Sequence, residues 1–338
     1  MCAIGRYHVV AVEDPVFHEE AFVLEDHSVG SSALVIPGLG NNLMIFVAGF
    51  PSSQLEVILG APAGTTADNA WRCGNPILFP FPNRVKNARY TFDGHEYHLD
   101  VNMPEGHHLH GLVCYLPWSV DQVASEDRGA VIRCSFNAED YPDVLRQYPF
   151  LFRLTVAYVL SGNLLRCEAE VWNVGSGALP MGFGLHPYFR VPLRPGGSRE
   201  ECLISVPARR IWQLSAEKLP TGQQEPVPPE LDFRKPRPLD DIYLDHSYTD
   251  IVREAGRATC RIIDPHAHVE IIERFGPEFP ELVVLAPSDR STVSFEPYSC
   301  VTDAINLASQ RHDTGLIILQ PGDRWKGAVE FTVESAGD

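Results

Sequence analysis

A carboxylate, Glu296, stands directly after the alternating run Thr292–Phe295, a pattern that predicts a strand with one buried face. Pro297 cannot donate a hydrogen bond to a sheet, so we expect the strand to end at Glu296 and a loop carrying Asp303 and Asn306 to follow. A carboxylate at the end of a rigid strand can be aimed at a bound molecule. Most glutamates are simply solvated, so an acid–base role for Glu296 requires partners elsewhere in the chain.

Histidines are the candidate partners. His186 follows the stretch Gly182–Leu185 and precedes a proline, a context that leaves space around the imidazole, although a lone strand histidine is often an ordinary core residue. His107, His108 and His110 stand close together, and in an extended chain His108 and His110 share one face, a spacing that metal sites use. No glutamate follows them closely enough to complete a mixed ligand shell, which argues against a metal site.

Two further charged residues lie beside proline-rich segments. Arg84 ends the segment 75–84, whose three prolines exclude a helix and favour a fixed, extended backbone. A guanidinium held there can bind hydroxyl or carboxylate oxygens, and the alternative is an ordinary surface ion pair. Asp245 follows the proline-rich loop that begins at Glu225, where it could accept hydrogen bonds from sugar hydroxyls. Taken alone, this segment also matches a solvated acidic loop.

The charge and composition of the chain restrict its class of partner. With 27 Lys and Arg against 44 Asp and Glu, the formal net charge is −17. This balance argues against nucleic acid and anionic membranes as partners and weighs against phosphorylated substrates. The eight cysteines are scattered, as expected for reduced, buried thiols. No apolar run approaches the ~18 residues of a membrane helix, and the N-terminus lacks a signal-peptide core, so we expect a soluble, cytoplasmic chain.

The elements that must position these residues are almost all strands. Tyr90–Leu99 contains an Asp-Gly pair between alternating runs, the strongest short-range signal for a hairpin. Leu165–Val171 alternates apolar with charged residues, a half-buried antiparallel pattern. The only helix candidate is a short segment near Asp140–Arg146. Roughly fifteen short strands without βα alternation predict an all-β antiparallel sandwich. No linker or repeat divides the sequence, so we expect residues 1–338 to form one domain.

The segments that hold the candidate residues carry a family resemblance. The chain resembles the aldose 1-epimerase (galactose mutarotase) family over nearly its whole length. The matching stretches occur in the family's order: NPILFPFPNR at 75–84, YTFDGHEYHL at 90–99, HHLHGLVCYLPW at 107–118, GFGLHPYF at 182–189, LPTGQQEPV at 219–227, LDHSYTD at 244–250 and FEPYSCVTDAIN at 295–306. Each stretch alone is a weak signal, but together and in this order they are specific.

The resemblance implies a large β-sandwich, of the galactose mutarotase-like type, whose concave face holds a monosaccharide without a metal or an organic cofactor. It implies that Glu296 is the general base and His186 the general acid. It also implies that Arg84, His110 and Asp245 bind the sugar, while neighbouring His107 and His108 have no counterpart.

One departure from the family concerns the residues after the catalytic glutamate. Galactose-type members carry Thr-Gln there, whereas this chain has Pro297-Tyr298, so the preferred sugar does not follow from the resemblance. Tyr188 and Trp118 are aromatic residues near the motifs that could stack on the apolar face of a sugar.

The implied reaction interconverts the α and β anomers of a free aldose by acid–base ring opening. It requires a base for the C1 hydroxyl and an acid for the ring oxygen, which suits an ionised carboxylate and an imidazole on opposite sides of C1. One alternative is a hexose-6-phosphate 1-epimerase, for which Arg72, Lys86, Arg89 and Arg190 are basic residues near the motifs. Another is a non-catalytic carbohydrate-binding protein of the same fold.

Overall fold

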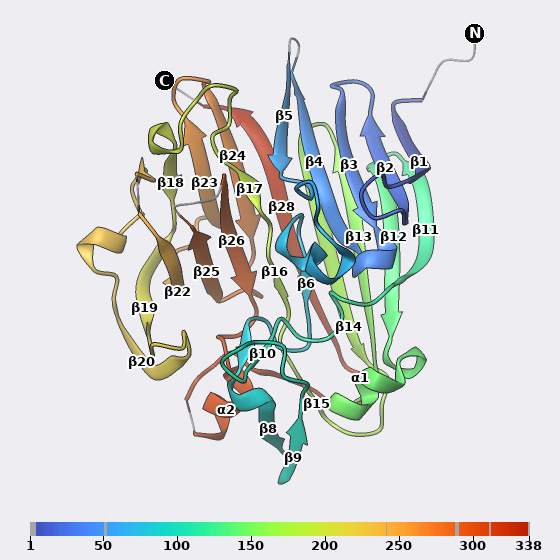
Figure 1. The fold of residues 1–338 in the computed structure, drawn as a ribbon, viewed down its shortest axis with the longest axis vertical. Coiled ribbons are helices and arrows are strands. Elements are labelled where there is room, and N and C mark those ends of the chain that lie inside the picture. The colour runs from blue at the N-terminus through green and yellow to red at the C-terminus, as the bar shows by residue number, and fades with distance from the viewer. Residues whose placement is uncertain (1–4, 51–52, 241, 288–290, 311, 337–338) are drawn as a thin grey trace.

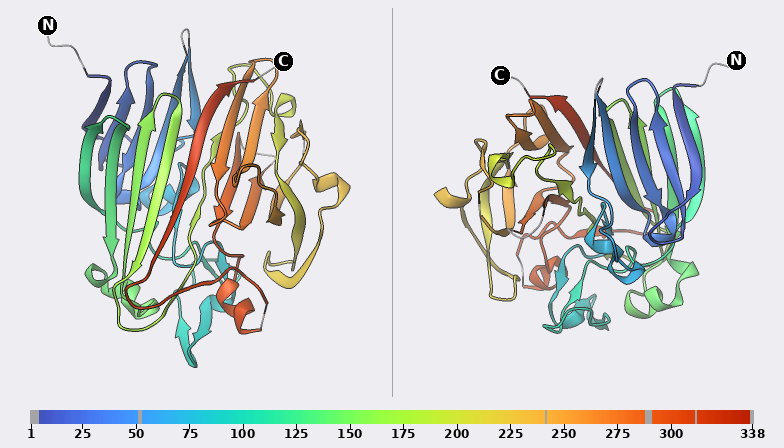
Figure 2. Two further views of the ribbon diagram at one scale, coloured as in Figure 1. Left: turned by 180° about the vertical axis from the view of Figure 1, so that it is seen from behind. Right: turned by 45° about the horizontal axis from the view of Figure 1, so that its top comes forward.

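A computed structural model describes residues 5–50, 53–240, 242–287, 291–310 and 312–336 of the chain (Figure 1). Across these residues the chain consists mainly of strands arranged in two large antiparallel sheets, and short hairpins and helices gather at one end (Figures 1 and 2). The blue strands of the first sheet lie in front of the green strands of the second in Figure 1, and the rear view in Figure 2 reverses this order. The predicted all-β antiparallel sandwich is confirmed.

The first sheet carries Glu296 and Asp245 among the candidate residues. Its strands follow the spatial order β1 (Tyr7–Glu13), β2 (Glu20–Asp26), β3 (Ser31–Ile36), β4 (Asn42–Phe50), β5 (Ser53–Ile58), β17 (Phe189–Arg190), β26 (Thr292–Tyr298), β25 (Glu281–Ala286), β22 (Leu244–Ile251), β19 (Ala208–Leu214) and β20 (Pro220–Pro226). In addition, β16 (Gly184–Leu185) pairs with both β26 and β6 (Ile77–Leu78).

The second sheet packs behind the first. Its order is β11 (Ser119–Glu126), β12 (Gly129–Asn137), β13 (Phe152–Ser161), β14 (Leu164–Asn173), β28 (Arg324–Ser335), β24 (Val269–Phe275), β23 (Ala258–Asp264), β18 (Leu203–Ser205) and β21 (Arg237–Pro238). The smaller elements are the pairs β7 (Arg84–Val85) with β10 (His108–Leu109), β8 (Arg89–Phe92) with β9 (His95–His98) and β15 (Leu179–Met181) with β27 (Ile317–Leu319), and the helices α1 (Pro142–Gln147) and α2 (Ala304–Ser309).

The core lies between the two sheets. Phe189 of β17 and Phe331 of β28 are wholly buried, and their ring centroids are 5.7 Å apart across the layer. Burying a side chain of this size stabilises the fold by about 1.5–3 kcal/mol. In β14 the expected alternation is present, because Leu165, Cys167 and Val171 are buried while the charged residues between them are partly exposed.

Two local predictions are confirmed. The Asp-Gly pair forms the turn between β8 and β9, and both Asp93 (φ 49°) and Gly94 (φ 73°) adopt the positive φ angles that a two-residue hairpin turn requires. The helix expected near Asp140–Arg146 is α1.

The prediction for the segment after Glu296 is wrong in two respects. The strand β26 does not end at Glu296 but continues through Pro297, which pairs with Leu282 of β25, to Tyr298. Asp303 and Asn306 do not lie on a loop, because Asp303 is the N-cap of α2 and Asn306 is inside this helix. The six-residue helix α2 was not predicted because so short a helix does not show a helical apolar period.

The physical reason for the longer strand is a gap in the sheet. On the side of β26 that faces β16 and β17, the described pairs involve only Thr292, Val293 and Tyr298. A proline within this gap removes no hydrogen bond from the ladder on that side.

Seven cysteines lie in the described part of the chain, and all of them are free and buried. Among the described residues, no helix is long and apolar enough to cross a membrane.

Candidate active site

The pairing of β16 with β26 brings the predicted acid and base together. Gly184 pairs with Tyr298, two residues after Glu296, and His186 follows β16 directly. This close approach requires a glycine, because a Cβ atom at position 184 would lie 2.5 Å from the ring carbon Cδ1 of Tyr298. Gly184 therefore serves packing against β26 rather than flexibility.

Glu296 and His186 are in direct contact. His186 Nε2 lies 3.3 Å from Glu296 Oε1, and the two side chains are only 4% and 2% exposed. The Tyr298 hydroxyl donates a hydrogen bond to the other carboxylate oxygen, Oε2. The ring of Tyr188 stacks on the imidazole of His186 with centroids 4.5 Å apart, and its hydroxyl lies 3.4 Å from Nε2. The Glu296 carboxylate is therefore held between His186 and Tyr298, and the His186 imidazole between Glu296 and Tyr188.

The pKa of Glu296 is raised well above its ordinary value. Burial is the main cause, because the carboxylate loses water. The hydrogen bond from Tyr298 opposes this rise, the charge of Asp245 adds to it, and the charge of Arg84 opposes it. We expected Glu296 to begin ionised, but burial leaves more of it protonated at a given pH and makes the ionised form a stronger base.

His110 lies beside His186 on a strained turn. Its backbone adopts φ 66°, and its N–H donates to the backbone oxygen of Asn83 at 2.8 Å. Gly111 follows with φ 70°, where a Cβ atom would lie 2.2 Å from a backbone oxygen. The His110 ring is 5.4 Å from the rings of both His186 and Trp71. Burial lowers the pKa of His110 well below its ordinary value, and His186 adds to this effect, so His110 is a neutral imidazole that can donate and accept.

The guanidinium of Arg84 is held by its neighbour. Asn83 adopts φ 61°, and its Oδ1 accepts hydrogen bonds from the backbone N and the Nη1 of Arg84, each at 2.9 Å. Asp303, at the start of α2, donates its N–H to the backbone oxygen of Arg84 at 3.0 Å. Among the described residues no carboxylate lies within ion-pair distance of Arg84, so its remaining donors can bind another molecule.

Asp245 lies in β22, two strands from Glu296, rather than in a solvated loop. Its Oδ2 is 3.4 Å from the Lys218 ammonium and 3.3 Å from the Tyr243 hydroxyl. Because the charge of Asp245 contributes to the raised pKa of Glu296, the two carboxylates face the same region. All five predicted site residues thus lie around Glu296 and His186, with Arg84 and His110 contributed by the β7–β10 pair and the turn after it.

Two other candidates, Trp118 and His108, have structural positions. Trp118 is 5% exposed, its indole N–H donates to the backbone oxygen of Val113 at 3.1 Å, and its ring packs on Phe136, so it cannot stack on a sugar. The His108 ring nitrogens lie 2.7 and 2.9 Å from backbone oxygens of Asp100 and Gly111. Within the described ranges no group of three or more His, Cys, Asp or Glu side chains is arranged to hold a metal ion.

Sequence reasoning missed several residues of this site. Tyr298 was noted only as a departure from the family, although its alternation with Glu296 would have placed both side chains on one face had the strand been extended past Pro297. Asn83 and Lys218 act on Arg84 and Asp245 through contacts that sequence spacing does not reveal, since Lys218 comes from the turn between β19 and β20.

Comparisons with known proteins identify the family and the fold of the chain. The uncharacterized protein YihR of Escherichia coli (strain K12) is 28% identical over 174 residues, which are 51% of this chain and 53% of that protein, so the match spans about half of the relative. A galactose mutarotase-like protein from Clostridium acetobutylicum superposes with a TM-score of 0.88 at 18% identity, covering 98% of this chain and 99% of that one. The galactose 1-epimerase from Lactobacillus acidophilus superposes with a TM-score of 0.74 at 17% identity, covering 98% and 99%.

These structural neighbours confirm the galactose mutarotase-like fold. The family model for aldose 1-epimerase matches residues 30–332, a range that includes every residue of the site. The chain belongs to the aldose 1-epimerase family.

Proposed function

We propose that the chain is an aldose 1-epimerase that interconverts the α and β anomers of a free aldose by acid–base ring opening. The contact between the buried carboxylate of Glu296 and the imidazole of His186 carries this proposal. A protein that only binds sugar has no need for a proton donor and acceptor 3.3 Å apart. The family and fold support the same reaction class.

The proposed reaction needs two proton transfers and no redox step. Glu296 removes the proton of the C1 hydroxyl, and the electrons of that O–H bond form the carbonyl at C1. The bond from C1 to the ring oxygen breaks, and the ring oxygen takes this electron pair and a proton from His186. Rotation about the C1–C2 bond followed by reversal of both transfers closes the other anomer. Each positioned transfer typically contributes ~10²–10⁴ to the rate.

We expected the acid and the base to lie on opposite sides of C1, but in the structure the two side chains are neighbours. A neighbouring pair is sufficient, because the hydroxyl oxygen and the ring oxygen are bonded to the same carbon. In this arrangement the sugar lies over the pair with C1 facing Glu296 and His186. The raised pKa of Glu296 strengthens the base that accepts the first proton.

The other predicted residues hold the sugar while C1 turns. Arg84 offers guanidinium donors, Asp245 offers a carboxylate acceptor, and neutral His110 offers one of each. Hydrogen bonds from charged groups to sugar hydroxyls are stronger than neutral ones, so we assign most of the binding to Arg84 and Asp245.

Polarimetry tests the proposal. The decay of optical rotation of freshly dissolved α-glucose and α-galactose is measured with wild type, Glu296→Gln and His186→Asn, after subtraction of the spontaneous rate. We expect each substitution to lower kcat at least ~100-fold. Glu281→Gln is a matched control, because Glu281 is also a buried carboxyl of this sheet, but its oxygens accept from Trp212 at 2.8 Å and Thr249 at 2.9 Å.

Retention of activity by both Glu296→Gln and His186→Asn would refute the assigned roles. If wild type accelerates the anomerisation of no aldose yet binds sugars in calorimetry, the chain is a carbohydrate-binding protein and not an epimerase.

A further inference from the structure

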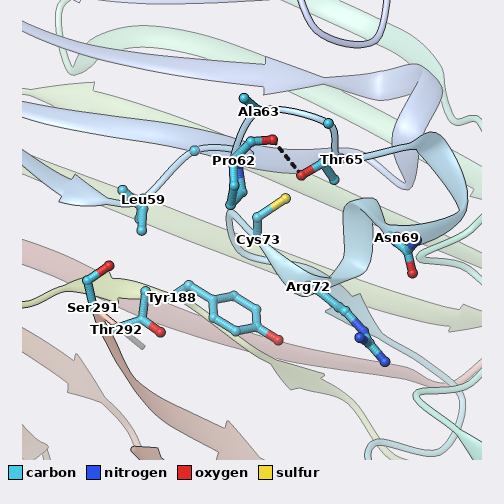
Figure 3. A pocket seen from close by; sticks show the side chains of 12 residues that line it. Leu59, Pro62, Ala63, Thr65, Asn69, Arg72, Cys73, Tyr188, Ser291 and Thr292 are labelled. Carbon is cyan, nitrogen blue, oxygen red and sulfur yellow. Dashed lines mark hydrogen bonds between the residues drawn. The ribbon is translucent and has the colours of Figure 1, made fainter. Parts of the chain in front are cut away.

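A cavity of about 450 Å³ adjoins the acid–base pair (Figure 3). Its walls come from the segment 59–65 that follows β5, from the 3-10 helix Ala67–Arg72 and from the start of β26. The side chain of Tyr188 lies between this cavity and the site, since it lines the cavity and also stacks on His186. The cavity is therefore separated from His186 by a single aromatic ring.

A chain of ring contacts leads from the catalytic pair to the other wall of the cavity. The ring of His186 contacts that of His110 at 5.4 Å, and His110 contacts Trp71 at 5.4 Å. The guanidinium of Arg72 lies over the Trp71 ring, 4.7 Å from its centroid. In Figure 3 this guanidinium and the Tyr188 hydroxyl extend toward the same side of the cavity. Stacking on the indole restricts the guanidinium without using its N–H donors.

The guanidinium of Arg72 gives the cavity a positive charge in an otherwise acidic chain. Arg72 is the only charged side chain among the described residues that line the cavity, and no described carboxylate lies within ion-pair distance of it. Two of the other basic residues near the motifs are neutralised, since Arg190 pairs with Glu56 at 2.6 Å and Arg89 pairs with Glu96 at 3.7 Å. In a chain with a net charge of −17, a guanidinium that lines a cavity and has no carboxylate partner among the described residues is a local positive site.

We propose that this cavity is a subsite for an acidic substituent of the sugar, a carboxylate or a phosphate group carried away from C1, and that Arg72 binds its oxygens. The proposal rests on the proposed function, because it places the rest of the sugar at Glu296 and His186. The guanidinium fork matches the oxygens of either anion. The net charge of the whole chain weighs against such substrates, but a guanidinium in direct contact with the bound anion outweighs distant, screened carboxylates.

Wild type and Arg72→Gln are compared on three sugars with a free C1: glucose, glucuronate and glucose 6-phosphate. We expect wild type to have a higher kcat/KM for at least one acidic sugar than for glucose. Arg72→Gln should lower that value ~10–100-fold and change the value for glucose less than twofold, because only the charge-assisted hydrogen bonds are lost. Arg128→Gln is the control, since Arg128 binds Glu126 and Glu168 on the second sheet and should change none of the values.

The pattern across the two acidic sugars distinguishes the anions. A preference for glucuronate alone assigns a carboxylate, and one for glucose 6-phosphate alone assigns a phosphate. An equal loss on glucose and on both acidic sugars would overturn the proposal, because Arg72 would then merely support Trp71.

The subsite can be tested even if the proposed function fails. If wild type epimerises none of the three sugars, the dissociation constants of glucuronate and glucose 6-phosphate are measured by calorimetry with wild type and Arg72→Gln. A ~10–100-fold weakening would support the subsite, and unchanged constants would overturn it.

Discussion

Tyr298→Phe tests how the carboxylate of Glu296, the proposed base, is controlled. The substitution removes one hydroxyl and keeps the ring, which packs against Gly184. This hydroxyl donates to Glu296 Oε2, and both residues are almost fully buried. The hydrogen bond favours the ionised carboxylate, so it opposes the rise in the pKa of Glu296 that burial causes. Without it, the pKa of Glu296 should rise further.

The size of the shift follows from the kind of bond. A hydrogen bond to a charged group contributes about 1.5–3 kcal/mol. Each pKa unit corresponds to about 1.4 kcal/mol, so the loss should raise the pKa of Glu296 by about 1–2 units. A base that must lose its proton before it acts then becomes active at higher pH. The acidic limb of kcat/KM should move up by the same ~1–2 units, with a ~10–100-fold loss below it and little loss above it.

The assay is polarimetry of α-glucose from pH 5 to pH 9 with subtraction of the buffer-catalysed rate at each pH. Tyr158→Phe is the matched control, because Tyr158 is also buried but donates to the backbone oxygen of Asn41 at 3.1 Å. It should lose some stability and keep the pH profile of wild type. An acidic limb that stays in place in a cooperatively folded Tyr298→Phe variant would refute the reasoning.

Two further predictions concern buried carboxyls outside the site. Glu273 of β24 is wholly buried, and neither of its side-chain oxygens has a hydrogen-bond partner among the described residues; burial and the charge of Glu296 raise its pKa well above its ordinary value. The unfolded chain releases this proton above about pH 4.3, whereas the folded chain keeps it, so wild type should lose stability as pH rises. Glu273→Met removes this titration and should be more stable than wild type by up to about 3–4 kcal/mol at pH 7. If urea titrations gave wild type and Glu273→Met the same slope of unfolding free energy against pH, the prediction would be contradicted. Asp26 is buried, which alone would raise its pKa, but hydrogen bonds from Arg6, Ser28 and Gly162 hold it well below its ordinary value. Its contribution to stability is present above the unfolded-state pKa of about 3.9 and is lost as pH falls through the lower folded-state pKa. Asp26→Asn should cost about 1.5–3 kcal/mol at pH 7 and flatten the acid side of the stability curve, and equal stability of the two proteins at pH 7 would exclude this role.

Sequence patterns predicted most of the sandwich because its strands obey local rules. The period of two in β14 and the Asp-Gly turn of the β8–β9 hairpin are properties of a few adjacent residues. The order of strands in the sheet could not be predicted from the sequence, since β5, β17 and β26 are neighbours in the sheet although they are far apart in the chain. Such pairing depends on contacts that no local pattern encodes.

That the five candidate residues lie close together could be predicted from the sequence, but their geometry could not. Glu296, His186, Arg84, His110 and Asp245 follow from motif resemblance and lie together in the structure. Their controlling contacts come from separate elements. The Arg84 guanidinium is held by a neighbour with a left-handed backbone, and Asp245 is held by a lysine of a distant turn. These contacts determine the charge state and the orientation of the side chains, and neither property can be predicted from spacing along the chain.

The failure at Pro297 connects the fold to the chemistry. The rule that a proline ends a strand assumes a ladder on both sides, whereas β26 lacks described partners at positions 294–297 on the side of β16 and β17. Because the strand continues, Tyr298 lies on the same face as Glu296, two residues away, and its hydroxyl reaches the carboxylate. Had the strand ended at Glu296, the buried carboxylate would lack the hydrogen bond that favours its ionised form. The local rule therefore fails at the position where the proposed base needs its support, as expected where function and not regularity determines the backbone.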